Sequence, residues 1–437
     1  MRPSLARVLS ASGSTSVPEE WIDAAARISG ERAAIETLLA HDPSPHIYGF
    51  TTLLGQLDTQ REEKVDQTEL LKAHLVGTQR DAPAEFVALV TRCKIEQLHH
   101  GGSGVHPDTY LALLRLDTVA GVAARGAWLS SYGAGDVVPA AWWIDNVIPS
   151  AARANLRQGD LIALLNGNFY STALGVTAAM SAVEVLGSFV ARAARLCSYP
   201  RSGPTRGGAL LSPELGDYFA RNARSHPSDQ PQLPISLRDA DAYLVPIAVA
   251  VAAVGEALER RLAVSSANPL FDVTGDGVKV ESQSGFLDVT LTLALTNLAQ
   301  AIHLAMRATQ RFIVHASETR IEKNGSPDVH RVQPPKAAMA IVERAGLVGG
   351  QLPLQFTGSD SDGIEDLRDL SLLTAANVLE LAAMTRETIA LLDSVVPGPS
   401  DDPEPAHALM ELLTGESSLD TRALLTYFEA MRAPFLV

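Results

Sequence analysis

Cysteine is scarce in this chain of 437 residues. It has only two, Cys93 and Cys197, and they stand in unrelated sequence contexts. A disulfide framework and a cysteine-rich metal site are therefore not expected, and a reducing compartment is. The first residues also lack a sustained apolar run, so we predict no signal peptide and a cytoplasmic location.

Positive charge is scarce as well. The chain has 35 lysines and arginines against 50 acidic residues, which gives a net charge of −15. Phosphate backbones and anionic membrane surfaces repel such a chain, so neither nucleic acid nor a membrane is a predicted partner. The composition is instead consistent with a soluble cytoplasmic enzyme.

Long uninterrupted apolar runs are missing. The most apolar segment, Leu244–Leu258, contains Pro246 and Gly255 and meets a charge at Glu256. We predict a buried core helix here and consider the segment too short to span a bilayer.

Aromatic residues make up 5% of the chain and strand-like alternation is rare, whereas 46% of the residues are apolar. This composition predicts an all-α protein with a large core. Apolar periodicity predicts helices over Trp21–Leu39, Glu69–Val76, Phe86–Leu98, Pro107–Ala127, Asp239–Leu262, Val289–Val314 and from Gly363 onward. The irregular stretch Arg201–Pro234 divides the chain into two predicted units, 1–200 and 201–437.

The stretch from Trp128 to Trp143 has the pattern of a turn that leads into a buried helix. Gly133 and Gly135 allow backbone angles that other residues avoid. Asp136 is a favourable N-cap residue, and a proline three positions later is tolerated in a first turn. We therefore expect a helix to begin directly after Asp136.

Three polar residues each have a structural and a functional interpretation. Tyr48 is either a tyrosine packed on its own turn or a functional phenol. His74, on a predicted helix, is either structural or turned toward a ligand. Asn166 either caps the turn at Gly167 or contributes its amide to a site.

Further candidates lie in both units. Arg238 offers two parallel donors that suit a carboxylate, although a helix cap or an ion pair would also explain it. Glu365 is either a ligand-binding carboxylate or part of the electrostatics of a helix start. His99 and His100 are adjacent, point in different directions and lack a spacing of three or four residues, so we predict no metal site.

These segments, taken in chain order, resemble the histidine and phenylalanine ammonia-lyase family. The similarity runs from Ile47 to Asp366 and includes Tyr48-Gly49, Leu70–Leu75, Gly102–Val105, Ser131–Asp136, Leu156–Ala173, Gln232–Arg238, Ser265–Leu270 and Glu365-Asp366. The resemblance implies an all-α bundle of long helices. It also implies a homotetramer whose active sites contain residues from several subunits.

The resemblance assigns roles in the N-terminal unit. Tyr48 matches the tyrosine that acts as the family's catalytic base. His74 matches a pocket residue beside the ring of the substrate. Asn166 matches the asparagine that binds the amino acid.

The resemblance also assigns roles in the second unit. Gln232 is retained, and Arg238 matches the arginine that binds the substrate carboxylate. Glu365 is the residue that histidine-type members carry and therefore indicates an imidazole-like substrate. Ile235 replaces a tyrosine of the family, which is a departure.

The segment that carries the family's prosthetic group is degenerate. Family members cyclise an Ala-Ser-Gly tripeptide into an electrophilic methylidene-imidazolone. Here Gly133-Ala134 runs directly into Gly135-Asp136, so the serine is absent. An Ala-Ser-Gly tripeptide does occur at 11–13, but we do not expect the group to form there. The prediction is therefore an enzyme without a cofactor.

The missing electrophile argues against an ordinary ammonia-lyase. The resemblance then implies a lyase for a carboxylate-bearing imidazole or aromatic amino acid derivative with a good leaving group, such as trimethylamine. Ergothionase, which is similar to this family and lacks the electrophile, performs such a reaction. Two alternatives stay open: an isomerase or cyclase of specialised metabolism, and an inactive lyase-like binding protein.

Overall fold

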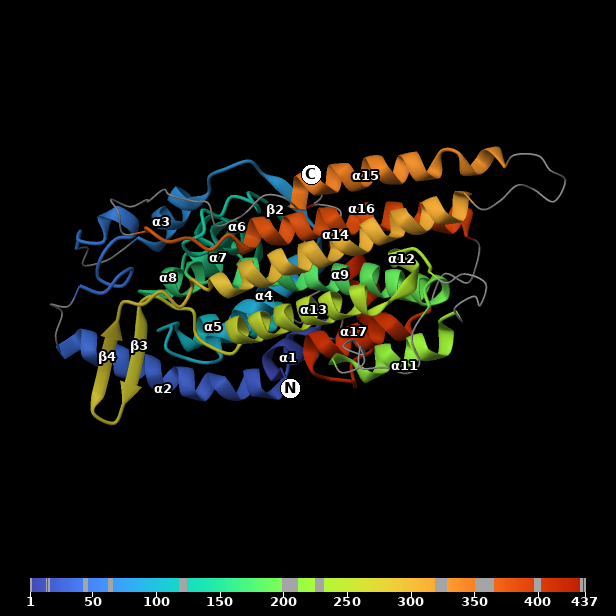
Figure 1. Ribbon diagram of the computed structural model, residues 1–437. Helices are drawn as coiled ribbons and strands as arrows, with labels where there is room; N and C mark the ends of the chain where they lie inside the picture. Colours follow the sequence, from blue (N-terminus) through green and yellow to red (C-terminus); the bar gives the residue numbers. More distant parts are fainter. Residues whose placement is uncertain are drawn as a thin grey trace.

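Long helices that run side by side form the body of the protein (Figure 1). In this computed structural model they are α9 (Phe169–Leu196), α13 (Asp241–Leu262), α14 (Val289–Glu318) and α16 (Ser371–Val395). Helix α14 packs against α13 and α16, and α16 packs against α9. Helix α15 (Pro334–Gly349) lies along α14 and α16.

The structure describes residues 2–12, 14, 16–41, 46–61, 66–117, 124–198, 211–224, 232–318, 328–349, 365–396, 402–432 and 435.

The long helices follow from their apolar periodicity. In α14, Leu291, Leu295, Leu298 and Ile302 recur every three or four residues and are buried. This spacing places them on one stripe of the helix that faces the bundle. The predicted helices at 239–262 and 289–314 are confirmed, the first beginning two residues later and the second extending to Glu318.

The prediction that the segment Leu244–Leu258 is too short to span a bilayer was wrong. The apolar segment is part of the 22-residue helix α13, which is long and apolar enough to cross a bilayer, as are 160–196 and 289–317. The most apolar window of 160–196 is 89% buried inside the protein, and those of the other two are 56% buried. These helices therefore pack much of their apolar surface against one another, as predicted for core helices.

The N-terminal helices pack beside one end of the bundle. They are α1 (Pro3–Ala11), α2 (Glu19–His41), α4 (Ala84–Leu98) and α5 (Pro107–Asp117). Helix α4 packs against α9 and α5, and its side chains from Phe86 to Leu98 are nearly all buried. The predicted helix 107–127 is wrong in its second half, because residues 124–126 form a short strand.

Short elements connect these helices near the same end. They are η1 (Gly55–Leu57), α3 (Gln67–His74), α6 (Val137–Val147), α7 (Ser150–Arg153), α8 (Asp160–Leu165) and the strands β1 (Arg80–Ala82), β2 (Ala124–Gly126), β3 (Leu270–Thr274) and β4 (Gly277–Glu281). Strand β1 pairs with β2, and β3 with β4, both antiparallel. These two small sheets were not predicted, because strands this short carry little sequence signal.

The remaining elements belong to the second predicted unit. They are α11 (Pro213–Asn222), α12 (Ile235–Arg238), η2 (Val329–Arg331), α17 (Glu404–Thr414) and α18 (Thr421–Glu429). Helix α17 packs against α9, α13 and α11, whereas α18 packs against α9 and bonds Arg92 of α4 through Tyr427. Helix α11 lies inside the stretch 201–234 that we predicted to be irregular. Residues 199–210 and 225–231 lie outside the described part, so the boundary between the two units stays a prediction.

Close helix packing at Gly255 offers a test of the fold. A Cβ atom there would lie 2.0 Å from the carbonyl oxygen of Leu413 on α17, so Gly255→Ala should lower the free energy of unfolding by about 1–3 kcal/mol. A Cβ at Gly30 of α2 meets nothing within 4 Å, and Gly30→Ala should raise the free energy of unfolding by about 0.5–1 kcal/mol. Thermal unfolding of the two variants should therefore shift in opposite directions. Equal shifts would contradict the packing of α13 on α17.

Candidate functional site

A cavity of about 530 Å³ opens where the N-terminal turns meet the starts of the bundle helices. Its wall contains Tyr48, His74, Ala134, Asn166 and Glu365. These residues come from the turn 47–51, the end of α3, the loop before α6, the end of α8 and the segment before α16. The fold thus brings together five of the residues that the sequence singled out.

Gln232 and Arg238 do not line this cavity. Arg238 ends α12 and is exposed, and its guanidinium donates to the carbonyl of Leu233 and to Oε1 of Gln232. Helix α12 packs near the far end of α14, where the hydroxyl of Ser236 lies 3.3 Å from Nε2 of His315. At 1.5 Å per residue, the 26 steps along α14 from Val289 to His315 span roughly 39 Å. Arg238 therefore cannot reach the cavity of its own chain.

The degenerate loop depends on its two glycines. Gly133 and Gly135 both have positive φ, at 90° and 79°, as expected. The carbonyl of Gly133 accepts a hydrogen bond of 2.7 Å from the backbone N–H of Asp369. A Cβ at Gly133 would lie 2.5 Å from the carbonyl oxygen of Asp369. A side chain at Gly133 is thus excluded by both the backbone angle and the close approach of the segment before α16.

Asp136 stands at the N-cap position of α6 but does not cap that helix. Its carboxylate accepts a 2.7 Å hydrogen bond from the backbone N–H of Ser171, in the first turn of α9. It also accepts a 3.2 Å hydrogen bond from the hydroxyl of Ser131. The prediction that Asp136 caps α6 was therefore wrong, because its side chain bonds the first turn of α9 instead. Burial raises the pKa of Asp136 to about 6.

Tyr48 is half-buried, and its phenol oxygen accepts a 3.0 Å hydrogen bond from the backbone N–H of Gly55. Burial raises the pKa of Tyr48, the N–H of Gly55 opposes this, and the nearby charge of Glu365 adds to it. A phenol that acts as a base near neutral pH needs a pKa below its ordinary value, and in the single chain the pKa of Tyr48 is shifted the other way. Among the described residues, no positively charged side chain opposes this rise in the pKa of Tyr48.

His74 has a defined tautomer. Its Nδ1 lies 2.6 Å from the carbonyl oxygen of Leu70, which can only accept, so Nδ1 carries a hydrogen. In the neutral imidazole the other nitrogen is then an acceptor. His74 thus offers the cavity a ring nitrogen that can receive a hydrogen bond from a ligand.

Asn166 caps the turn at Gly167, as one of its two interpretations predicted, and its role in binding stays a prediction. Its Oδ1 accepts a hydrogen bond from the backbone N–H of Gly167, and this bond caps the turn. Its Nδ2 donates a 2.8 Å hydrogen bond to the carbonyl of Asn268. The same residue lines the cavity and is 6% exposed. Its backbone carbonyl accepts a 2.8 Å hydrogen bond from the ammonium group of Lys94, a residue that motif comparison missed.

Glu365 lies in a non-helical segment that precedes α16, since that helix begins at Ser371. The expected link between Glu365-Asp366 and the start of this helix was therefore wrong. The acidic residue at the helix start is Asp369, whose carboxylate accepts from the backbone N–H of Ser371 at 2.9 Å.

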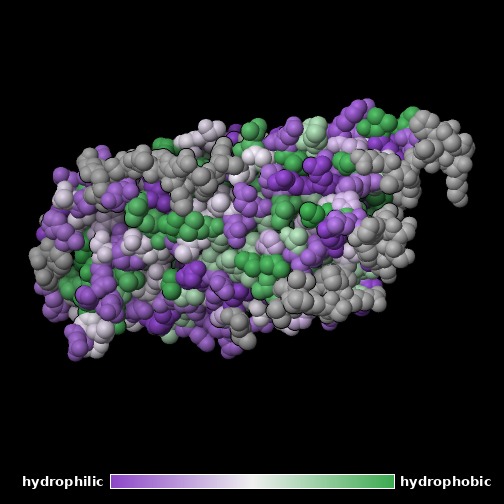
Figure 2. Space-filling model, in the orientation of Figure 1, coloured by the Kyte–Doolittle hydropathy of each residue, from purple (hydrophilic) through white to green (hydrophobic). Residues whose placement is uncertain are grey.

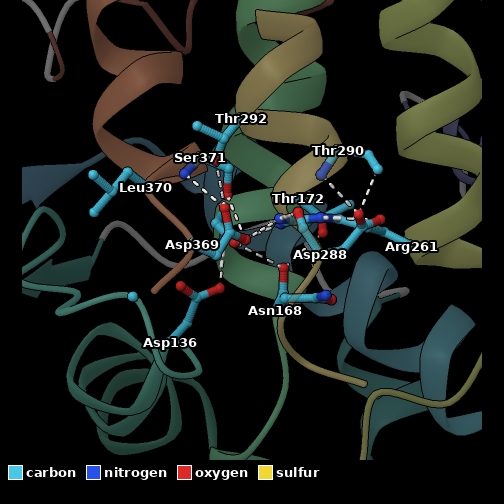
Figure 3. Close-up of polar contacts among 12 residues, drawn as sticks. Asp136, Asn168, Thr172, Arg261, Asp288, Thr290, Thr292, Asp369, Leu370 and Ser371 are labelled. Carbon is cyan, nitrogen blue, oxygen red and sulfur yellow. Dashed lines mark hydrogen bonds and ion pairs between the residues drawn. The ribbon is translucent and has the colours of Figure 1, made fainter. Parts of the chain in front are cut away.

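A buried ion pair holds this segment in place. Arg261, at the end of α13, pairs with the carboxylate of Asp369, and both side chains are buried (Figure 3). Arg261 also donates to the hydroxyl of Ser171 at 3.1 Å and to the carbonyl of Asp288 at 2.7 Å. Thr292 of α14 donates to the second oxygen of Asp369. The pair thus joins the ends of four long helices behind the cavity.

A second polar cluster lies away from the cavity, at the end of α4. Within the described ranges, Glu96, His99 and His100 place one possible metal-ligand atom each within 4.8 Å of one another. The spacing argument against a metal site overlooked Glu96, which precedes the histidines by three and four residues. Both carboxylate oxygens of Glu96 are already bonded, however, one to Arg7 and the other to Trp21. The cluster therefore anchors α1 and α2 to α4.

Comparisons with known proteins bear on the fold. The sequence profile described as aromatic amino acid lyase matches residues 5–149. Ergothionase from Treponema denticola superposes with a TM-score of 0.70 at 14% identity, over 98% of this chain and 97% of that one. Tyrosine aminomutase from Streptomyces globisporus gives 0.68 at 17% identity, over 98% and 97%.

Histidine ammonia-lyase from Trypanosoma cruzi gives a TM-score of 0.64 at 19% identity, over 97% of this chain and 91% of that one. The predicted resemblance to the histidine and phenylalanine ammonia-lyase family is confirmed, and so is the predicted fold of that type. The similar structures include lyases and aminomutases built on one scaffold.

Removal of the Asp369 carboxylate should expose the importance of the buried pair. Asp369→Ala leaves the guanidinium of Arg261 buried without its partner and should cost roughly 3–5 kcal/mol of stability. The double variant Arg261→Met/Asp369→Leu removes both charges and should recover most of that loss. Glu281→Gln, which breaks the exposed pair with Lys279, is the control and should change stability by less than about 1 kcal/mol. A neutral effect of Asp369→Ala in chemical denaturation would refute the role of the pair.

Proposed function

We propose that the protein is a lyase that eliminates a good leaving group, such as trimethylamine, from a carboxylate-bearing imidazole or aromatic amino acid derivative, without a methylidene-imidazolone. The observation that carries this proposal is the cavity wall itself. Tyr48, His74, Asn166 and Glu365 surround Ala134, and the residue after Ala134 is Gly135 where the family places the serine that forms the electrophile.

The chemistry explains why a good leaving group is needed. Ammonia leaves poorly, and the family's electrophile makes its departure possible. A quaternary trimethylammonium group already leaves as a neutral amine and has no lone pair for an electrophile to capture. As Tyr48 removes the β-proton, the C–H electron pair forms the Cα=Cβ bond and the C–N pair departs with trimethylamine. The proton finally passes from Tyr48 to solvent or to the amine.

Ergothioneine is the first substrate to test. It is a trimethylammonium betaine with a carboxylate and a thio-imidazole ring. His74 and Glu365 would bind the ring, since one offers an acceptor nitrogen and the other a carboxylate. The ergothionase from Treponema denticola, which is similar in fold, is described as degrading ergothioneine. The similarity in fold supports the choice of substrate but does not by itself assign it.

The carboxylate of the substrate would bind Arg238 and Gln232 from a second copy of the chain. Neither residue reaches the cavity of its own chain, and an added guanidinium beside Tyr48 would lower the pKa that burial raises. Large apolar side chains remain exposed along the bundle, including Leu293, Leu347 and Leu373. Figure 2 shows apolar patches on the visible face of the molecule. These features support the homotetramer with shared sites that the resemblance implies.

An isomerase of the aminomutase type is the second candidate. Two aminomutases are among the similar structures, from Pantoea agglomerans and Streptomyces globisporus. A product of unchanged mass would favour this candidate over the lyase. An inactive binding protein would instead be stabilised by a ligand without converting it.

Incubation with ergothioneine should release trimethylamine and a thio-imidazole acrylate that absorbs in the ultraviolet. Because Tyr48 is the proposed base, Tyr48→Phe should lower kcat by about 10²–10⁴-fold. Gas chromatography of the amine and ultraviolet absorbance measure the two products independently. Tyr110→Phe, at a tyrosine buried away from the cavity, is the control. No turnover by the parent protein, or equal turnover by Tyr48→Phe, would overturn the lyase proposal.

Mixed oligomers test the shared site. Tyr48→Phe and Arg238→Gln should each be inactive alone, because each removes one contribution to every site. Co-expression of the two variants should restore roughly a quarter of the parental activity, since random assembly of symmetric oligomers pairs an intact Tyr48 with an intact Arg238 in that share of sites. Failure of the mixture to exceed either variant would place Arg238 outside the active site.

A further inference from the structure

Lys94 is a buried cation directly behind the cavity wall. It is one of six lysines in the chain, it lies on α4 and it is 2% exposed. Its ammonium donates a 2.8 Å hydrogen bond to the backbone carbonyl of Asn166 and lies 4.5 Å from the ring centroid of Phe169. The aromatic face stabilises a cation at this distance. A charged side chain is therefore held in the interior against the peptide that ends α8.

The peptide that Lys94 holds carries the Asn166 side chain, whose amide also bonds the carbonyl of Asn268 and the backbone N–H of Gly167. Asn166 is followed by Gly167, whose φ of 131° turns the chain from α8 toward α9. Asn166 lines the cavity, and a Cβ atom at Gly135 of the degenerate loop would lie 3.2 Å from its Oδ1. Any rotation of this peptide would move the amide relative to Ala134 and the cavity.

We propose that Lys94 is a positioning residue whose ammonium fixes the Asn166 peptide and thereby directs the Asn166 amide into the active-site cavity. A hydrogen bond from a charged donor is about twice as strong as one from a neutral donor, so the protonated amine holds the carbonyl best. This inference rests on the proposed function only in so far as Asn166 binds the substrate. The fixation of the peptide is independent of the reaction.

The charges around Lys94 make its protonation sensitive near neutral pH. Burial lowers the pKa of Lys94 to about 7, and the carboxylate of Asp136 opposes this shift. Behind Asp136 lie Arg261, which favours its charged form, and Asp369, which disfavours it. The ammonium of Lys94 is therefore present below about pH 7 and lost above it.

Hydrogen–deuterium exchange tests the fixation without any substrate. In Lys94→Met the backbone amides of 166–168 should exchange about tenfold faster or more than in the parent at pH 6, because the charged donor is gone. Arg92→Met is the matched control: it removes another buried cation of α4, one that bonds Tyr427 instead of the cavity wall, and should leave these amides unchanged. Unchanged exchange in Lys94→Met, or equal acceleration in Arg92→Met, would overturn the inference whether or not ergothioneine is a substrate.

The pH profile tests the link to the active site. Log kcat/KM of the parent should rise with pH as Tyr48 ionises and level off above about pH 7 as Lys94 loses its proton, because the two ionisations oppose each other. Lys94→Met should be slower at pH 6, mainly through a higher KM, and its profile should continue to rise without the break. A break that persists in Lys94→Met would contradict the proposed role. If the parent converts no substrate, the lyase proposal fails and the exchange experiment alone decides this inference.

Discussion

The buried pair of Arg261 and Asp369 is the interaction on which the site depends. It lies where α13 ends and α14 and α16 begin, and it contacts the first turn of α9 through Ser171. Two charges in an interior are stable only when additional hydrogen bonds offset their loss of hydration. Here hydroxyls, a backbone N–H and a carbonyl supply those hydrogen bonds, and Nε of Arg261 is the one atom of the pair left without a hydrogen-bond partner among the described residues. The backbone of Asp369 in turn holds Gly133, so the position of the degenerate loop follows from the packing of the bundle.

Polar groups from five segments of the chain meet in the cavity wall around Ala134. Ala134 is followed by Gly135, yet the two glycines, Asp136 and Asn166 still hold the loop in a defined turn. Behind the wall lie Lys94 and Asp136, two buried groups whose pKa values burial shifts toward neutrality from opposite sides. The proposed elimination needs no electrophile from this wall. It needs a base, a binding site for the ring and a partner for the carboxylate.

Much of the fold could be predicted from the sequence, because long helices repeat their apolar residues every three or four positions. Five cavity residues were also found, since each stands in a short segment that resembles the family. Contacts between distant segments could not be predicted. Whether Asp136 caps α6 or α9 depends on where α9 packs, and the pKa of Tyr48 depends on how deeply its turn is buried. Lys94 gave little sequence signal, because one lysine in an apolar helix usually extends to solvent.

The mass of the intact protein, measured on a preparation that converts ergothioneine, tests the central claim most directly. Formation of a methylidene-imidazolone removes two water molecules from the chain, whereas a site that works without it leaves the mass unchanged. We predict the mass that the sequence gives. A mass lower by two waters would show that the prosthetic group forms in this chain after all, and would contradict an electrophile-independent reaction.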